Sequence, residues 1–215
     1  MKNQSMRKLA GNLVLLFIFL ACGYALFNPQ RLLHVLGPGH GHLADLYLET
    51  YELGLAQHGR FLEWPALAAI NGEEKLGQAP QEMGVVLYLD DQGCSVCADD
   101  QTAFLRELAE RGVKVRVVVN ADRPAYVRSY VRVNDLGHVP VYYDEKNAFA
   151  RANDLHHTPT LLVHNERSEV IAAHIPAVSI EAMTTTFHRA VWRLAREYSP
   201  SFMDPDDEDL ISPGL

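Results

Sequence analysis

Basic residues and cysteines are scarce in this chain. Lysine and arginine together number 19 among 215 residues, against 27 acidic residues, so the formal net charge is −8. Without a basic stripe to neutralise phosphates, we expect no nucleic-acid partner. The cysteines number only three, and the sequence contains no internal repeat. A hydrophobic fraction of 48% in a chain of this length supports one good-sized core rather than two full domains.

Long hydrophobic runs are also lacking, except at the N-terminus. An uncharged run covers residues 9–30, and the basic residues Lys2, Arg7 and Lys8 precede it. About 20 apolar residues suffice for a helix to cross the hydrocarbon core of a membrane. Because positive flanks stay cytoplasmic, we expect residues 9–27 to make a single pass through the inner membrane and the rest of the chain to lie in the periplasm.

Residues 1–27 have two further interpretations besides an uncleaved anchor. A signal peptidase could cut after the small residues between Ala21 and Ala25, which would release a periplasmic protein. Alternatively, Cys22 could be acylated as in a lipoprotein, although Phe19 stands where such signals carry an aliphatic residue. In each case the remainder is exported into a compartment that permits disulfides.

Residues 28–80 form an extension rich in helix-forming residues. Apolar residues recur near helical spacing over residues 43–55, which predicts a helix there. A second short helix is expected over residues 62–70. Residues 37–42, which read Gly-Pro-Gly-His-Gly-His, are expected to form a turn or hinge before the first helix.

From residue 84 onward, short strands alternate with helices, which predicts the α/β class with a central mixed sheet flanked by helices. Strand patterns occur at residues 85–89, 113–119, 139–143, 160–164 and 169–175. Helical patterns occur at residues 97–110, between a cap at Asp122 and a stop at Gly137, at 146–153 and at 179–198. We interpret residues 81–198 as one domain and residues 199–215, which are rich in acidic residues and proline, as a disordered tail.

Cys94 and Cys97 form the one C-x-x-C pair of the sequence, shortly after the first strand of this domain. Cys94 falls where a helix begins, and the unpaired N–H groups and dipole of a helix N-terminus stabilise a thiolate. Cys97 lies one helical turn further, within reach of a disulfide. The pair predicts a redox site that needs no other cofactor, with Cys94 as the exposed nucleophile and Cys97 as the buried resolving thiol. A structural zinc ion would need four ligands, and no second C-x-x-C is present, so we expect no metal.

Three stretches make residues 84–198 resemble the thioredoxin superfamily, and within it the membrane-anchored TlpA-type branch of bacterial thiol–disulfide oxidoreductases. They are the C-x-x-C pair at a strand-to-helix junction, Thr158-Pro159-Thr160 leading into a strand, and residues 140–144 with 149–153, which are similar to the strand and helix that this branch inserts. The resemblance implies a thioredoxin-like fold, a cis peptide bond before Pro159, and a loop in which Thr158 and Pro159 face the disulfide and the substrate.

Two further side chains are candidates for the site. Asp100 stands three residues after the second cysteine, where the branch often has a carboxylate, so the resemblance suggests a proton-relay role toward Cys97. His156 and His157 directly precede the proline loop, and one of them could lie near Cys94 and favour its thiolate.

These features predict an exported thiol–disulfide oxidoreductase that exchanges disulfides with protein substrates and is served by a membrane redox partner. The direction stays open, because Gln92-Gly93 and Ser95-Val96 replace the aromatic and proline residues that are usual in the branch. A peroxiredoxin-like peroxide reductase is an alternative, although residues 88–94 lack the proline and threonine of its P-x-x-x-[TS]-x-x-C setting. A non-catalytic thioredoxin-fold module that docks an envelope assembly is the third interpretation.

Overall fold

The computed structural model describes residues 38–91, 93, 95–176, 181–199 and 202. The chain divides into two compact units, Met1–Leu48 and Glu49–Leu215. The expected membrane segment, most of the acidic tail and Cys94 lie outside the described residues. Within the described part of the chain, no helix combines the length and the apolar character needed to cross a membrane.

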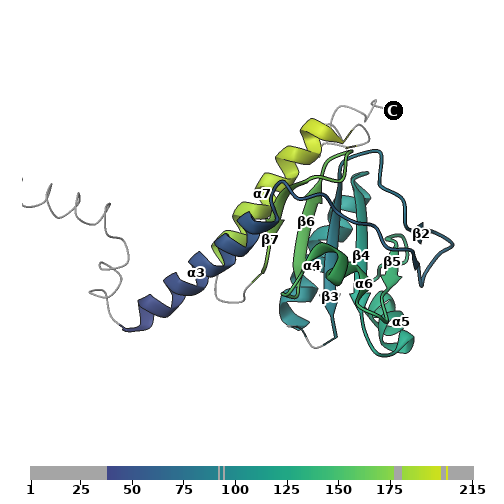
Figure 1. Ribbon diagram of the computed structural model, residues 1–215, viewed down its shortest axis with the longest axis horizontal. Coiled ribbons are helices and arrows are strands. Elements are labelled where there is room, and N and C mark those ends of the chain that lie inside the picture. The colour runs from purple at the N-terminus through teal and green to yellow at the C-terminus, as the bar shows by residue number, and fades with distance from the viewer. Residues whose placement is uncertain (1–37, 92, 94, 177–180, 200–201, 203–215) are drawn as a thin grey trace, which may run out of the picture. The chain divides into compact units, whose positions relative to one another are not determined.

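A five-stranded mixed sheet forms the centre of the second unit (Figure 1). Its strands are β3 (Gly84–Asp90), β4 (Lys114–Asn120), β5 (Val141–Tyr143), β6 (Thr160–His164) and β7 (Val170–His174). The spatial order is β5-β4-β3-β6-β7. The strands β3, β4 and β5 are parallel, whereas β6 is antiparallel to β3 and β7 is antiparallel to β6. The predicted mixed sheet is therefore confirmed, and each expected strand is present with small changes at its ends.

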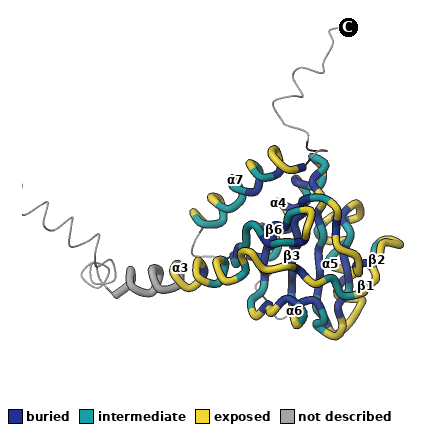
Figure 2. Tube along the Cα trace, turned by 45° about the horizontal axis from the view of Figure 1, so that its top comes forward, coloured by how far each residue is buried: buried dark blue, intermediate teal, exposed yellow. Residues whose placement is uncertain are grey.

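Three helices cover one face of this sheet and complete its larger core. They are α4 (Ser95–Glu110), α5 (Pro124–Val133) and α7 (Glu181–Tyr198). Successive side chains of a strand point to opposite faces, and β3 is buried on both. Val85, Leu87 and Leu89 of β3 share this core with buried residues of all three helices, which include Leu105, Val127 and Val191. Figure 2 shows the buried residues gathered along the strands, where their apolar surface is removed from water.

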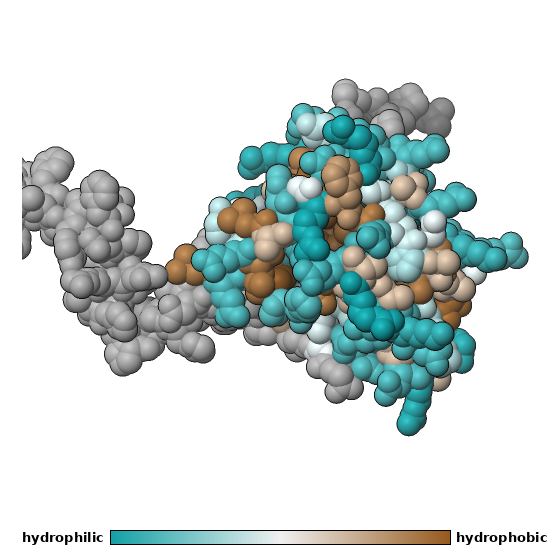
Figure 3. Space-filling model, in the orientation of Figure 1, coloured by the Kyte–Doolittle hydropathy of each residue, from teal (hydrophilic) through white to brown (hydrophobic). Residues whose placement is uncertain are grey.

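The opposite face of the sheet is covered by α6 (Ala148–Asn153) and by the chain that precedes β3. Val86 and Tyr88 of β3 pack there with Phe149 of α6 and with Leu62. On the face of the molecule drawn in Figure 3, hydrophobic residues lie in several separate groups among hydrophilic ones.

The prediction of a helix over residues 62–70 is wrong, because this segment is largely extended. It contains the short strand β1 (Leu67–Ala68), which pairs antiparallel with β2 (Lys75–Leu76). Pro65 has no amide proton and restricts Trp64 to extended conformations, which disfavours a helix here. Of the described part of the expected helical extension, only the first stretch is therefore helical.

The starts of α4 and α6 differ by two residues from the expected ones, and those of α3 (Pro38–Gln57) and α5 differ in more informative ways. The helix α3 starts within residues 37–42, so the turn expected there is wrong from Pro38 onward. Proline is tolerated in the first turn of a helix, because the N–H group that it lacks would have no partner within the helix. The helix α5 begins after Arg123, which takes the capping position expected for Asp122, and it ends before the glycine that was expected to stop it.

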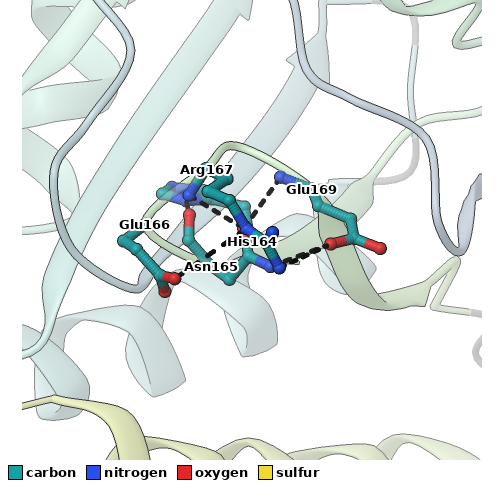
Figure 4. Close-up of polar contacts among 5 residues, drawn as sticks. All are labelled: His164, Asn165, Glu166, Arg167 and Glu169. Atoms are coloured by element: carbon teal, nitrogen blue, oxygen red, sulfur yellow. Dashed lines mark hydrogen bonds and ion pairs between the residues drawn. The ribbon is translucent and has the colours of Figure 1, made fainter.

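The β6–β7 hairpin is closed by a turn that Asn165 organises (Figure 4). The carboxamide oxygen of Asn165 accepts the backbone N–H groups of Arg167 and Glu169, at 2.9 and 3.0 Å. Its carboxamide nitrogen donates to the carboxylate of Glu169 at 3.1 Å. Ser168 has a φ of 65°, which lies in the left-handed region. This turn helps to fix the pairing of β6 with β7.

Candidate redox site

The N-terminus of α4 and the loop before β6 meet at one edge of the sheet. The strand β3 ends at Asp90, α4 begins at Ser95, and Gly93 lies between them. Because β6 runs antiparallel to β3 with Thr160 opposite Tyr88, the residues just before Thr160 lie beside the end of β3. Two motifs that are distant in the sequence are thus brought together.

The second cysteine of the pair is buried. Cys97 lies in the first turn of α4, and only 6% of its surface is exposed. A buried sulfur at this place suits a resolving thiol, since a protein substrate cannot reach it directly. Cys94 lies outside the described residues, so its assignment as the nucleophile stays a prediction.

The proline loop contacts the C-x-x-C loop through Thr158. The Thr158–Pro159 peptide bond is cis, as the sequence predicts. The hydroxyl oxygen of Thr158 accepts the backbone N–H of Asp90 at 2.9 Å. A Cβ atom at Gly93 would lie 2.9 Å from Cγ2 of Thr158, which is closer than real Cβ contacts, and 3.0 Å from its Oγ1, which is a tight contact. Glycine directly before the first cysteine therefore lets this loop approach the Thr158 side chain closely, and a larger residue would force a local shift.

The two histidines before the proline loop have different surroundings. Nε2 of His156 lies 2.9 Å from a carboxylate oxygen of Asp154, and both side chains are exposed. The backbone carbonyl of His157 accepts the hydroxyl of Thr160 at 2.6 Å, and His157 itself is half-buried. The structure thus ties the backbone of His157 to the proline loop, whereas a role for its imidazole beside Cys94 stays a prediction.

A buried glutamine lies on the same face of α4 as Cys97. Gln101 follows Cys97 by four residues, a spacing that makes side chains neighbours on a helix, and it is 1% exposed. Its carboxamide oxygen lies 2.8 Å from Nε2 of His188 on α7. Asp100 is exposed, so the proton-relay role expected for it stays a prediction. The motifs do not reveal the Gln101–His188 pair, and only the four-residue spacing could have indicated its first member.

A second histidine, His174 at the end of β7, is buried in the same part of the core. Its Nε2 lies 3.0 Å from the hydroxyl of Thr184. Its ring stacks on Phe187 with 4.9 Å between the centroids, as the ring of His188 stacks on Phe104 at 3.7 Å. Burial lowers the pKa of both imidazoles to about 4. Both histidines are therefore neutral at neutral pH and add no positive charge to this part of the core.

A cavity of about 210 Å³ opens beside the proline loop. Its lining comes from the ends of β3 and β4, from α4, α5 and the loop itself, and includes Leu89, Val119, Ala98, Tyr126, Tyr130 and Pro159. The hydroxyl groups of Tyr130 and Thr102 are hydrogen-bonded, which holds the Tyr130 ring against α4. Among the described residues, no three His, Cys, Asp or Glu side chains are grouped so that they could hold a metal ion.

No protein-family model matches the chain, and no curated protein matches it in sequence. Solved structures do match its backbone. One of them, assigned as the thiol:disulfide interchange protein DsbE of Chlorobium tepidum, is 15% identical, and the match covers 62% of this chain and 96% of that one with a TM-score of 0.50. This chain has a thioredoxin-like fold.

Two further solved structures are similar at lower scores. The C-terminal domain of a protein assigned as a thiol-disulfide oxidoreductase from Bacteroides thetaiotaomicron is 10% identical, with 62% of this chain and 97% of that one covered and a TM-score of 0.48. StoA from Bacillus subtilis is 17% identical, with 57% and 96% covered and a TM-score of 0.45. The expected thioredoxin-like fold is confirmed, whereas membership of the superfamily and of its TlpA-type branch stays a prediction.

Proposed function

We propose that this protein is a thiol–disulfide oxidoreductase of the TlpA-type branch that exchanges disulfides with protein substrates through Cys94 and Cys97. The observation that carries the proposal is the contact of Gly93, directly before the first cysteine, with Thr158 of the proline loop. A fold alone does not define an activity, so the proposal rests on this site. The helix N-terminus, the buried second cysteine and the adjoining proline loop are the parts that such an exchange requires.

In the reducing direction, the Cys94 thiolate attacks one sulfur of a substrate disulfide, and the other substrate sulfur leaves as a thiolate. The resulting mixed disulfide joins Cys94 to the substrate. Cys97 then gives up its proton, and its sulfur attacks that of Cys94, which releases the substrate as a dithiol. Two electrons have passed to the substrate, its two sulfurs have taken up two protons, and the protein holds a Cys94–Cys97 disulfide. The oxidising direction runs through the same steps in reverse.

The chain's own groups assist these steps in separate ways. The N–H groups and dipole at the start of α4 stabilise the thiolate of Cys94, which makes it both a better nucleophile at neutral pH and a better leaving group. Thr158 and Pro159 line the cavity beside the site, where the backbone of Thr158 can pair with an extended substrate segment. His157 and Asp100 are the candidates for moving protons to and from the two sulfurs.

The proposed location is the periplasmic side of the inner membrane, with residues 9–27 as an anchor. It is supported by the basic residues that precede this uncharged run and by the requirement of a disulfide-permitting compartment. A membrane redox partner would return the cysteine pair to its starting state after each turnover. Alkaline phosphatase, which is active only after export, should be active when fused after Leu215, and a fusion that is inactive but well expressed would contradict export.

Trapping of the mixed disulfide tests the exchange itself. A Cys97→Ser variant should accumulate a covalent adduct with substrate protein, because the serine cannot resolve the bond between Cys94 and the substrate. The adduct should be visible on a non-reducing gel and disappear with reductant, and the Cys94→Ser and doubly substituted variants should not form it.

Two other outcomes of this experiment would contradict the proposal in part or as a whole. Adducts with Cys94→Ser in place of Cys97→Ser would reverse the two roles. If neither variant forms an adduct while the doubly substituted protein still binds its partner, the protein is a non-catalytic module and the proposal is wrong.

A further inference from the structure

The cavity beside the proline loop has an apolar interior and an aromatic wall. Leu89 and Val119 lie at the ends of two central strands, and Tyr126 and Val133 line it from α5. Tyr126 is 46% exposed and Val133 is 75% exposed, so both present large apolar surfaces to solvent next to the site. The cavity has a volume of about 210 Å³, which equals that of several water molecules of ~30 Å³ each. One long side chain would therefore fit into it.

Two carboxylates line the same cavity, and a third follows one of them in the sequence. Asp90 and Asp99 line it, and Asp91 follows Asp90 directly. Tyr126 lies close enough to all three carboxylates to be affected by them. Burial raises the pKa of its hydroxyl, and the negative charges of Asp91, Asp99 and Asp90 also raise this pKa. The negative charges are thus gathered around the exposed ring at the cavity mouth.

Neutral donors orient two of these carboxylates. Oδ2 of Asp90 accepts from the carboxamide of Asn120 at 2.7 Å, and Oδ2 of Asp91 accepts from the backbone N–H of Asp122 at 3.4 Å. Both of these donors are uncharged, and they hold the two carboxylates in place. A cation that enters the cavity would therefore meet an arranged negative field.

We propose that this cavity receives a lysine or arginine side chain of the substrate, within two residues of the substrate cysteine that reacts. The inference rests on the proposed exchange function. Lysine and arginine carry an apolar stem that would pack against the rings and Val133, and a charged end that would reach the carboxylates and the face of Tyr126. A leucine side chain would fill the interior without pairing with the charges, and a glutamate side chain would be repelled by them.

The test uses three short peptides joined as symmetrical disulfides, which differ only in having arginine, leucine or glutamate on both sides of the cysteine. The reduced protein is mixed with each peptide, and the second-order rate constant is measured. Flanking charges also alter the reactivity of the peptide's own sulfur, so each constant is divided by the one measured with dithiothreitol. We expect the normalised arginine rate to exceed the leucine rate by about fivefold and the glutamate rate by more, with smaller ratios at high salt.

Substitutions at two positions of α4, one beside the cavity and one at the far end of the helix, assign the effect to the cavity. Asp99→Asn should lower the ratio of the arginine rate to the leucine rate, and Asp99→Lys should lower it further. Glu110→Gln removes the same charge at the far end of α4 and should leave the ratio unchanged. Equal normalised rates for the three peptides, or an Asp99 effect no larger than that of Glu110→Gln, would overturn the inference.

Hydroxyethyl disulfide, which is uncharged, distinguishes failure of the proposed substrate preference from failure of the proposed exchange function. If it reacts with the Cys94–Cys97 pair while the peptides show no charge preference, the exchange function stands and the substrate preference is wrong. If neither it nor any peptide reacts, the exchange function itself is wrong, and the preference falls with it.

Discussion

The buried imidazole of His164 should make the fold sensitive to mild acid. His164 is fully buried at the end of β6, and its ring occupies the space that a Cβ atom at Gly84 would need, 2.8 Å from Nε2. Its Nδ1 lies 2.9 Å from the backbone carbonyl of Asn165 (Figure 4). Burial, with a smaller contribution from the positive charge of Arg116, lowers the pKa of His164 to about 4, against the opposing effect of the hydrogen bond to Asn165.

The sign of the effect follows from where the proton binds. In the unfolded chain the pKa of His164 is about 6.5, so between pH 6.5 and about 4 the unfolded state binds a proton that the folded state does not. The contribution of the neutral His164 to the free energy of unfolding is therefore fully present above pH 6.5. It decreases as the pH falls from 6.5 to about 4. Each pH unit within this range corresponds to about 1.4 kcal/mol, so His164 alone should account for a loss of about 2 kcal/mol between pH 7 and pH 5.

Urea unfolding of the natural protein and of a His164→Phe variant at pH 7, 6 and 5 measures this contribution. Phenylalanine keeps a flat ring but cannot bind a proton, so the variant should lose about 2 kcal/mol less than the natural protein over the same range. The comparison uses only the change in the free energy of unfolding with pH, so the absolute stability of the variant at pH 7 has no effect on it. A His138→Gln variant, which removes an exposed histidine, is the matched control. If His164→Phe and the natural protein lose the same amount, burial of a neutral His164 is refuted.

Two substitutions test the local contacts around the site. Gly93→Ala should lower the free energy of unfolding by about 1–3 kcal/mol, because the new methyl group would overlap Thr158, and Thr158→Ser should restore part of the loss in the double variant. Asp144→Ala should cost about 1–2 kcal/mol, since this buried carboxylate accepts the N–H groups of Ala148 and Phe149 at the start of α6. Urea unfolding measures both, and losses below about 0.5 kcal/mol would contradict these assignments.

The sequence predicts the sheet well, because its strands carry their own signal. The buried run from Val85 to Leu89 needs no alternation when both faces of a strand are covered, and the other strands show comparable runs between turn residues. The stretch around Trp64 carries a misleading signal. Its apolar residues cover the sheet as an extended chain, and their spacing over a few residues imitates that of a short helix.

At the candidate site, the motifs predict which residues take part but not which of them are in contact. The cis bond before Pro159 follows from the resemblance, whereas the contact of Gly93 with Thr158 depends on the register between β3 and β6, which no local pattern contains. The pairing of Gln101 with His188 joins two helices that are far apart in the sequence. Glutamine is common on surfaces, so only the packed structure shows that Gln101 is buried where it meets the partly buried His188.

The most direct test of the central claim is an equilibrium redox titration of the Cys94–Cys97 pair in the full chain. The protein is equilibrated over two series, one of ratios of reduced to oxidised dithiothreitol and one of reduced to oxidised glutathione, which together cover reducing and oxidising pairs, and is quenched with acid. The remaining thiols are then alkylated and assigned by peptide mass, so that Cys22 is scored separately. The account predicts that both thiols disappear together in one two-electron transition, with ~30 mV per tenfold change in the ratio of the disulfide to the dithiol form. Thiols at 94 and 97 that stay alkylatable at every ratio, or that oxidise independently of each other, would contradict it.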